Sequence, residues 1–285
     1  MNILLTGSNG FVGTYFKNKY SKKYNISTFS FFNDNINILN LKNINTIIHL
    51  SALVHQMGGA SKEEYEKVNV IQTIDLANKA KNSGVKHFIF MSTVKVYGEE
   101  TDISYTENTV CLPEDKYGRS KLKAELKLQE LEDENFIVSI IRTPIIYGYG
   151  VKANIKSLIS LVDKVKILPF GSINNKRSMV YIGNICHLID EISEKQIKGI
   201  FLAGDDESLS TTQLIQNISK SLNKRTLLIE IPLFERILKV LKSSFHKRLY
   251  CSLEVDNSIT KKKLNLVNPY TVKEGIKFMI NGEIK

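Results

Sequence analysis

A tyrosine and a lysine four residues apart, Tyr117 and Lys121 in "KYGRSKLKAE", have the spacing most suggestive of chemistry in this sequence. On a helix, residues four apart share a face, with Cβ atoms about 5–6 Å apart. A free phenol titrates near pH 10, and nearby positive charge favours its ionised form. We therefore predict that Tyr117 exchanges a proton with a substrate hydroxyl, with Lys121 beside it, if the fold supplies a cofactor and a cleft.

Two hydroxyl residues end an apolar stretch upstream of this pair. Ser92 and Thr93 close "FIFMST", and Tyr117 follows 24 residues after Thr93. Ligands of parallel α/β sheets lie beyond the carboxyl ends of the strands. We expect Thr93, with its neighbour Ser92 as the alternative, to meet Tyr117 in one catalytic cleft.

The N-terminal stretch "MNILLTGSNGFVG" is typical of a strand that turns into a helix through a glycine-rich loop. Glycines permit a tight turn and a close approach to a pyrophosphate, and the helix N-terminus offers free N–H groups to the anion. This context predicts a dinucleotide site. The residues expected to bind the cofactor are Gly7, Ser8, Asn9, Gly10, Phe11, Val12, Gly13, Asp34, Leu50, Ser51, Ala52, Tyr117 and Lys121.

Asp34 is the one acidic residue near the end of the next expected strand, Tyr24 to Phe31, and no Lys or Arg is close to it. An acid there binds a ribose 2′-hydroxyl, which favours NAD, with NADP as the alternative. The next apolar stretch begins at Ile36, although a parallel crossover normally needs a dozen or more residues. The usual helix is missing or the strand is short, which weighs against Asp34 as a ribose ligand.

The remaining pattern of the first half alternates strands and helices. "NTIIHLSALVHQM" reads as a buried strand and a loop, in which His49 is a hydrogen-bonded histidine at the strand end. His55 and Gln56 face either solvent or the nicotinamide side. "EEYEKVNVIQTIDLANKAKNSG" predicts a long helix ending at Gly84, before the strand "VKHFIFMST". We predict an α/β fold with a doubly wound parallel (Rossmann) sheet.

Composition narrows the class of protein further. The 285 residues carry a net charge of +10, but the lysines are dispersed and no basic stripe is interleaved with aromatics, so we expect no nucleic-acid partner. The three cysteines lack disulfide or zinc spacing, and we expect no metal. Without a signal-peptide pattern or an apolar run of about 18 residues, we expect a soluble cytoplasmic protein with no integral membrane segment.

The motifs "TGSNGFVG", "HLSAL", "STVKVYG" and "YGRSK" resemble, in order and spacing, those of the extended short-chain dehydrogenase/reductase family. This family includes nucleotide-sugar epimerases, dehydratases and reductases. The resemblance implies that Tyr117 is the catalytic acid/base, that Lys121 binds the ribose and lowers the phenol pKa, and that Thr93 bonds the sugar oxygen. It also implies a homodimer formed through two helices per subunit, one of them carrying Tyr117.

Two departures from the family's pattern narrow the chemistry. Val94 and Lys95 occupy positions where 4,6-dehydratases have an Asp and a Glu that eliminate water, so we do not expect dehydration. Ile145 occupies the position where galactose epimerases have an asparagine that contacts the sugar nucleotide.

We expect residues 1–150 to form the NAD(P)-binding domain, with its sheet completed by about 197–204, and residues 151–285 to form mainly a smaller α/β substrate domain. The resemblance implies a UDP-sugar held by Asn154, Phe170, Gly171, Arg177 and, by a weaker alignment, Arg248. An Arg suits a diphosphate because its planar fork makes bidentate bonds. The basic, amphipathic stretch from Leu227 to Arg248 contacts a membrane or, as we prefer, packs as a helix of this domain.

The segments "SALVHQM", "STVKVYGEE" and "GVKANI" most resemble a subgroup of this family that occurs in surface-polysaccharide biosynthesis. The leading hypothesis is a UDP-hexose or UDP-N-acetylhexosamine 4-epimerase acting through a transient 4-keto sugar with NAD. The alternative is an NAD(P)H-dependent reductase of a UDP-4-keto-6-deoxy-N-acetylhexosamine. A non-catalytic dinucleotide-sensing regulator is a distant third, since fold does not fix function.

Overall fold

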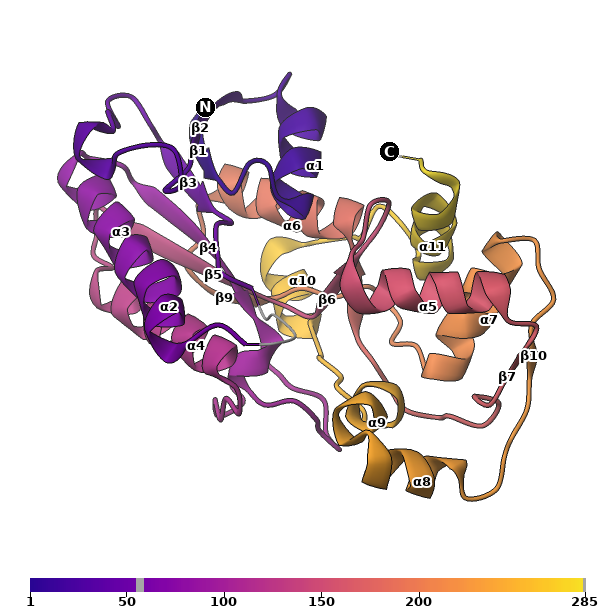
Figure 1. Cartoon of the computed structure of the whole chain (residues 1–285). Coiled ribbons are helices and arrows are strands. Elements are labelled where there is room, and N and C mark those ends of the chain that lie inside the picture. Colours follow the sequence, from indigo (N-terminus) through magenta and orange to yellow (C-terminus); the bar gives the residue numbers. More distant parts are fainter. Residues whose placement is uncertain (55–58, 284–285) are drawn as a thin grey trace.

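The computed structural model describes residues 1–54 and 59–283, so His55 and Gln56 lie outside the described residues. Its centre is a parallel sheet of six strands in the order β2-β1-β3-β4-β5-β9 (Figure 1). The strands are β1 (Asn2–Thr6), β2 (Asn25–Phe29), β3 (Thr46–His49), β4 (His87–Thr93), β5 (Ile137–Thr143) and β9 (Gly199–Leu202). The predicted Rossmann-like α/β sheet is confirmed.

Helices cover both faces of this sheet because the strands are apolar on both sides. Ile3 and Leu5 point into the hydrophobic core shared with α1 (Phe11–Tyr20) and α6 (Ile182–Lys195). Leu4, between them in sequence, points to the opposite core, which is formed with α3 (Gln72–Asn82) and α4 (Lys116–Glu130). The alternation along β1 therefore builds a three-layer unit.

The connection from β2 to β3 contains a single 3-10 turn, Ile36–Ile38, in place of a crossover helix. The strand expected over Tyr24 to Phe31 is correspondingly shorter, Asn25–Phe29. β1 pairs with both β2 and β3, so the strand order reverses around it. Such a reversal opens a crevice at the carboxyl ends of the strands, where ligands of this architecture bind.

The long helix expected before β4 is three consecutive helical pieces. α2 (Lys62–Tyr65) begins with a capping box between Ser61 and Glu64, a π-helical stretch follows at Glu66–Ile71, and α3 then runs to Asn82. Gly84, with φ +79°, ends this run in the left-handed conformation that glycine adopts without strain.

Most of the second half lies beside the sheet (Figure 1). Its strands form two small parallel pairs: β6 (Ile145–Tyr147) with β8 (Met179–Tyr181), and β7 (Ile167–Leu168) with β10 (Leu227–Leu228). Its helices are α5 (Ala153–Lys164), α7 (Thr211–Ser221), α8 (Phe234–Leu241), α9 (Ser243–Tyr250), α10 (Ser258–Leu264) and α11 (Val272–Asn281). Among residues 1–54 and 59–283, no helix combines the length and apolarity needed to cross a bilayer.

Candidate active site

A cavity of about 790 Å³ lies where the carboxyl ends of β1, β3 and β4 meet. The predicted cofactor-binding and catalytic residues that line it come from four separate segments. They are Gly7, Gly10, Phe11, Val12, Gly13, Leu50, Ser51, Ala52, Ser92, Thr93 and Tyr117. The topology thus brings the glycine loop, the loop after β3, the end of β4 and the start of α4 around one space.

The glycine loop fits a dinucleotide pyrophosphate. Gly7 has φ +68°, and a Cβ there would lie 2.8 Å from the backbone nitrogen of Ser51. A Cβ on Gly13 would lie 2.2 Å from the carbonyl oxygen of Gly7, so α1 can pack this closely only with glycine. α1 begins after Gly10 without a side-chain cap and without an acid in its first turn. Its first N–H groups are therefore suited to an anion.

A methyl group at Gly13 should disrupt this loop. Because the Cβ of Gly13→Ala would overlap the Gly7 carbonyl oxygen, the turn must shift, at a cost of about 1–3 kcal/mol, and we expect NAD affinity to fall by about tenfold or more. Isothermal titration with NAD measures the change. Gly84→Asn is the control, because Gly84 has a positive φ with open space around it. Unchanged affinity in Gly13→Ala would refute the role given to this loop.

Tyr117 is positioned by the first turn of α4. The carboxylate of Asp115 caps this helix by accepting a hydrogen bond from the Gly118 N–H at 2.6 Å. Lys95, just after β4, makes an ion pair of 2.6 Å with the same carboxylate. A Cβ on Gly118 would lie 2.7 Å from the Lys95 carbonyl oxygen, so α4 starts in direct contact with the end of β4. That contact places Tyr117 near Thr93.

Lys121 lies one turn further along α4 and is only 1% exposed. Its Nζ is 3.7 Å from the centre of the Phe90 ring, a cation–π distance. Burial lowers the pKa of Lys121 to about 7, although the Glu125 carboxylate opposes this shift. The amine therefore changes its charge near neutral pH in the protein without cofactor.

The Tyr117 phenol behaves differently from the sequence-based expectation. Burial, with smaller contributions from Asp115 and Tyr65, raises its pKa above the ordinary value. Burial within the polypeptide therefore favours the protonated phenol. The lowered pKa that we expected depends on the positive nicotinamide, whose charge favours the phenolate.

The two hydroxyl residues at the end of β4 have different partners. Thr93 lines the cavity, and its Oγ1 accepts a hydrogen bond of 3.3 Å from the Lys95 N–H. The Ser92 hydroxyl is buried and donates to the carboxylate of Glu125. Ser92 also lines the cavity, but its hydroxyl is already bonded to Glu125 and strand alternation directs the two side chains to opposite sides of β4, so Thr93 is the better placed of the two.

A buried ion pair lies behind the site. Arg142 on β5 donates to Glu125 from Nη2 at 2.6 Å and from Nε at 3.1 Å, and its guanidinium stacks 4.7 Å from the Tyr97 ring centre. Both charged side chains are almost fully buried. Since Glu125 also binds Ser92 and follows Lys121 by one turn, this network fixes α4 against β4 and β5.

Breaking this pair should destabilise the protein strongly. We expect Glu125→Leu, which leaves Arg142 buried and uncompensated, to lower the free energy of unfolding by about 3–5 kcal/mol. The double variant Glu125→Leu/Arg142→Met should recover most of this loss, because no unpaired charge remains. Urea unfolding measures both. The exposed pair Lys123–Glu66 is the control, where Lys123→Ala should cost less than about 1 kcal/mol. A double variant as unstable as the single one would contradict this explanation.

His49, at the end of β3, is a buried, hydrogen-bonded residue. His49 is 1% exposed and lies between the hydroxyls of Thr6 at 2.8 Å and Thr73 at 3.0 Å, as expected for a hydrogen-bonded strand-end histidine. Burial lowers its pKa to about 3, so it is neutral.

Asn69, in the π-helical stretch, was missed by the sequence analysis. Its side chain binds both backbone groups of Leu53, at 2.8 and 3.0 Å, and donates to Ser120 on α4 at 3.0 Å. The available signal was an amide on the apolar side of a helical pattern, and π-helical turns often mark functional sites.

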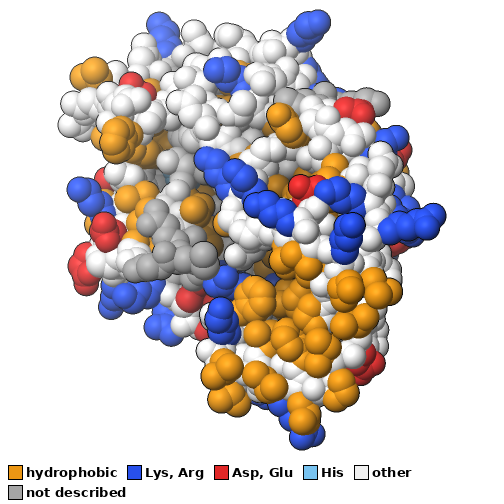
Figure 2. All heavy atoms as spheres, turned by 45° about the vertical axis from the view of Figure 1, so that its right-hand side comes forward, with side chains coloured by type: hydrophobic (Ala, Val, Ile, Leu, Met, Phe, Trp, Pro, Cys, Tyr) orange, Lys and Arg blue, Asp and Glu red, His pale blue; other side chains and the backbone are white. Residues whose placement is uncertain are grey.

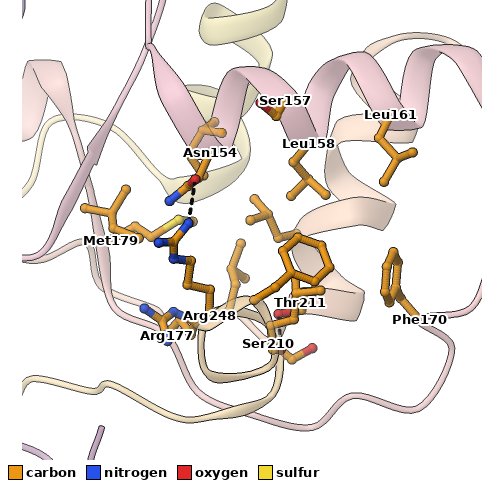
Figure 3. A pocket seen from close by; sticks show the side chains of 16 residues that line it. Asn154, Ser157, Leu158, Leu161, Phe170, Arg177, Met179, Ser210, Thr211 and Arg248 are labelled. Atoms are coloured by element: carbon orange, nitrogen blue, oxygen red, sulfur yellow. Dashed lines mark hydrogen bonds between the residues drawn. The ribbon is translucent and has the colours of Figure 1, made fainter. Parts of the chain in front are cut away.

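Arg177, Arg248 and Asn154 lie at the other end of the cavity, where it adjoins a smaller pocket of about 180 Å³. Arg248 donates to the Asn154 side chain at 3.2 Å (Figure 3), and Arg177 donates to the Cys251 carbonyl at 3.0 Å. Burial lowers the pKa of Arg177, and the nearby Arg248 acts in the same direction. Two neighbouring cations suit a diphosphate.

The smaller pocket beyond these arginines is mainly apolar. Leu158 and Leu161 of α5 line it, together with Phe170, which follows β7 (Figure 3). Ser210 and Thr211, at the start of α7, add hydroxyl groups. A small flat ring with polar edges fits such a lining.

Five predicted ligands line neither cavity: Ser8 and Asn9 lie between the lining residues Gly7 and Gly10, Lys121 lies one helical turn after Tyr117, and Asp34 and Gly171 lie elsewhere. Gly171 does not line either cavity; its N–H bonds the Ile229 carbonyl at 3.0 Å beside β10. Asp34 does not line the large cavity, and its carboxylate accepts a hydrogen bond of 2.8 Å from the Ser30 N–H. The short connection after β2 thus uses Asp34 to close a turn, where a ribose ligand was expected.

This fold and site define a class: a dinucleotide-dependent enzyme of the Rossmann type with a tyrosine–lysine pair beside the cofactor cleft. Residues 3–204 match the model of the NAD dependent epimerase/dehydratase family. The chain belongs to this family, and NAD is its cofactor. When bound, NAD accepts and returns hydride.

Similarity to individual proteins extends over nearly the whole chain. A UDP-glucose 4-epimerase of Vibrio cholerae is 38% identical over 97% of this chain and 93% of its own length. An N-acetyl-alpha-D-glucosaminyl-diphospho-ditrans,octacis-undecaprenol 4-epimerase of Escherichia coli O157:H7 is 26% identical, with 96% and 93% covered. The solved UDP-glucuronic acid 4-epimerase of Bacillus cereus in complex with NAD superposes with a TM-score of 0.80 at 21% identity, covering 99% and 98%. The last likeness concerns the fold.

Proposed function

We propose that this protein is a 4-epimerase of a UDP-hexose or UDP-N-acetylhexosamine that works through a transient 4-keto sugar. The main support is that one cavity is lined by the glycine loop, Thr93 and Tyr117 at one end and by two arginines at the other. The similarity to the Vibrio cholerae enzyme over nearly the whole chain supports it.

Each residue has a defined task in the proposed reaction. Tyr117 takes the proton of the carbon-4 hydroxyl as hydride leaves carbon 4, and returns a proton when the opposite face of the keto sugar is reduced. Thr93 bonds the same sugar oxygen. Lys121 binds the cofactor ribose, and Arg177 and Arg248 hold the diphosphate. The large cavity leaves the sugar room to turn between the two steps.

Dehydration is not part of the proposal. Val94 is buried, and the ammonium of Lys95 is paired with Glu99 at 2.8 Å and with Asp115 at 2.6 Å. Neither residue supplies the acid and base that water elimination requires.

The test begins with the purified protein and no added cofactor. We expect NAD in the supernatant after denaturation, and interconversion of UDP-N-acetylglucosamine and UDP-N-acetylgalactosamine, or of the corresponding hexoses, because an epimerase regenerates its cofactor in each turnover. Turnover of a UDP-4-keto sugar only with consumption of added NADH or NADPH would overturn the proposal in favour of a 4-ketoreductase.

We also propose a cytoplasmic homodimer that serves surface-polysaccharide biosynthesis. Ile71 in the π-helical stretch and Leu126 on α4 are exposed apolar residues on neighbouring helices, which supports association through this side. Light scattering should give a dimer mass that falls to the monomer value in Ile71→Lys/Leu126→Lys. A monomeric wild-type protein would contradict the assembly and leave the proposed reaction untouched.

A further inference from the structure

Helix α8 leaves an apolar face uncovered. Leu233, just before it, and Ile237, Val240 and Leu241 follow the i, i+4, i+7, i+8 spacing of one helix face, and all four are exposed. Val240 is 83% exposed and Leu241 is 75% exposed, whereas Leu238 is the residue of α8 that is buried. A helix that served only to complete the substrate domain would turn this stripe inward.

The apolar surface extends beyond α8. Phe245 on α9, Leu227 on β10 and Ile167 on β7 are also exposed. Figure 2 shows hydrophobic side chains gathered over the lower part of the face it presents. Contiguous apolar surface of this kind marks an interaction site more often than scattered single residues do.

Cations accompany this apolar face. Arg236 and Lys239 project from α8, and Lys242 lies between α8 and α9; all three are exposed. In Figure 2, further Lys and Arg side chains lie along the upper border of the apolar surface, on the side away from α8. The one acid of α8, Glu235, is 3.1 Å from the His246 ring nitrogen. The flanking charge is therefore mainly positive, complementary to an anionic surface.

We propose that α8, with Leu233 and Phe245, is a docking face for an anionic lipid bilayer, in which the helix lies in the plane of the headgroups. The bilayer then buries the apolar side chains of Ile237, Val240 and Leu241. Its anionic headgroups attract the flanking cations at the same time, as in other interfacial helices. A second copy of this chain is a poorer occupant, because its identical set of cations would be brought against the first.

Docking by α8 would also orient the site. α9 follows α8 after a single residue, and its Phe245, Arg248 and Leu249 line the smaller pocket. The substrate end of the cavity would therefore lie close to the membrane, while the sheet remains in solvent. The proposed epimerase reaction does not depend on this contact.

Vesicle co-sedimentation of the full chain tests the proposal. We expect binding to vesicles of phosphatidylcholine mixed with phosphatidylglycerol, weaker binding at high salt, and little binding to phosphatidylcholine alone. Val240→Ser/Leu241→Ser should weaken binding by about tenfold or more, since two large apolar side chains no longer enter the bilayer. Arg236→Gln/Lys239→Gln should weaken binding to the mixed vesicles by about tenfold.

The matched control is Ile103→Ser/Val110→Ser, two equally exposed apolar residues on the loop between β4 and α4, outside α8 and its apolar stripe, which should bind like the wild type. Equal binding by the Val240→Ser/Leu241→Ser variant would mean general attraction of a basic protein, and would overturn the proposal. Absence of vesicle binding by the wild type would also overturn the proposal. If the wild type then formed an oligomer that Val240→Ser/Leu241→Ser dissociates, the face would instead join two copies of the chain.

Discussion

Tyr117→Phe should abolish most turnover while leaving the fold intact. Removing the proton-transferring oxygen should lower kcat by about 10²–10⁴, because general acid–base catalysis contributes that much. The phenol pKa is raised by burial in the protein without cofactor. Because proton abstraction needs the phenolate, wild-type kcat/KM should rise with pH until the group ionises, and the residual activity of Tyr117→Phe should lack this rise.

The control is Tyr65→Phe, since the Tyr65 ring lies 6.1 Å from that of Tyr117 and its hydroxyl bonds the Val54 carbonyl at 3.4 Å. It should retain most of the activity. Epimerisation rates across pH, with circular dichroism to verify folding, measure the effect. A Tyr117→Phe enzyme with nearly wild-type kcat would remove Tyr117 from the mechanism and reopen the possibility of a sensor.

Lys121→Met should lose activity and gain stability. Met keeps the side-chain length and removes the amine that the ribose requires, so we expect kcat/KM to fall by about 10² or more. It also removes the cost of burying a cation next to Phe90. At pH 7 and below, the variant should be more stable than the wild type by about 3–5 kcal/mol, from a pKa near 7 folded against about 10.4 unfolded.

The sign of the pH dependence follows from proton binding. Between pH 7 and about 10.4 the unfolded chain holds the Lys121 proton and the folded chain does not, so wild-type stability rises with pH through this window. Lys121→Met should lack that rise, and the difference between the two proteins should shrink toward alkaline pH. Urea unfolding at several pH values measures it. Lys127→Met, on the exposed side of α4, is the control and should change stability by less than about 0.5 kcal/mol. A stability difference that is constant with pH would contradict the buried-cation explanation.

The predicted site residues that the structure brings to one cavity depend mostly on local geometry. The glycine loop needed only a strand, a turn between glycines and the start of a helix, and these are encoded within residues 2–20. The Tyr117–Lys121 spacing likewise required only a helix, which begins at Lys116. Thr93 was predicted to meet them because parallel strands end at one edge of a sheet.

The errors and omissions involve contacts between segments far apart in sequence. Ser92 and Thr93 are adjacent, and only the position of Glu125 on α4 decides that the Ser92 hydroxyl is taken. The link from Asn69 to both Leu53 and Ser120 is decided in the same way. Asp34 is the exception, because its carboxylate closes a local turn with the Ser30 N–H. Gly171 was placed by its resemblance to a motif, whereas its backbone pairs with the segment after β10.

The sequence alone determined the class of fold, the glycine loop between β1 and α1, and the position of Tyr117 and Lys121 one turn apart on a helix, because each arises from short-range periodicity and from residues with a special backbone or chemical property. Only the tertiary structure decided the charge states of Lys121 and His49, since a pKa depends on burial and on neighbours from other elements. It also decided that the apolar stripe of α8 faces outward. An amphipathic pattern fixes that a helix has an apolar face, but which surface that face meets depends on how the rest of the chain packs.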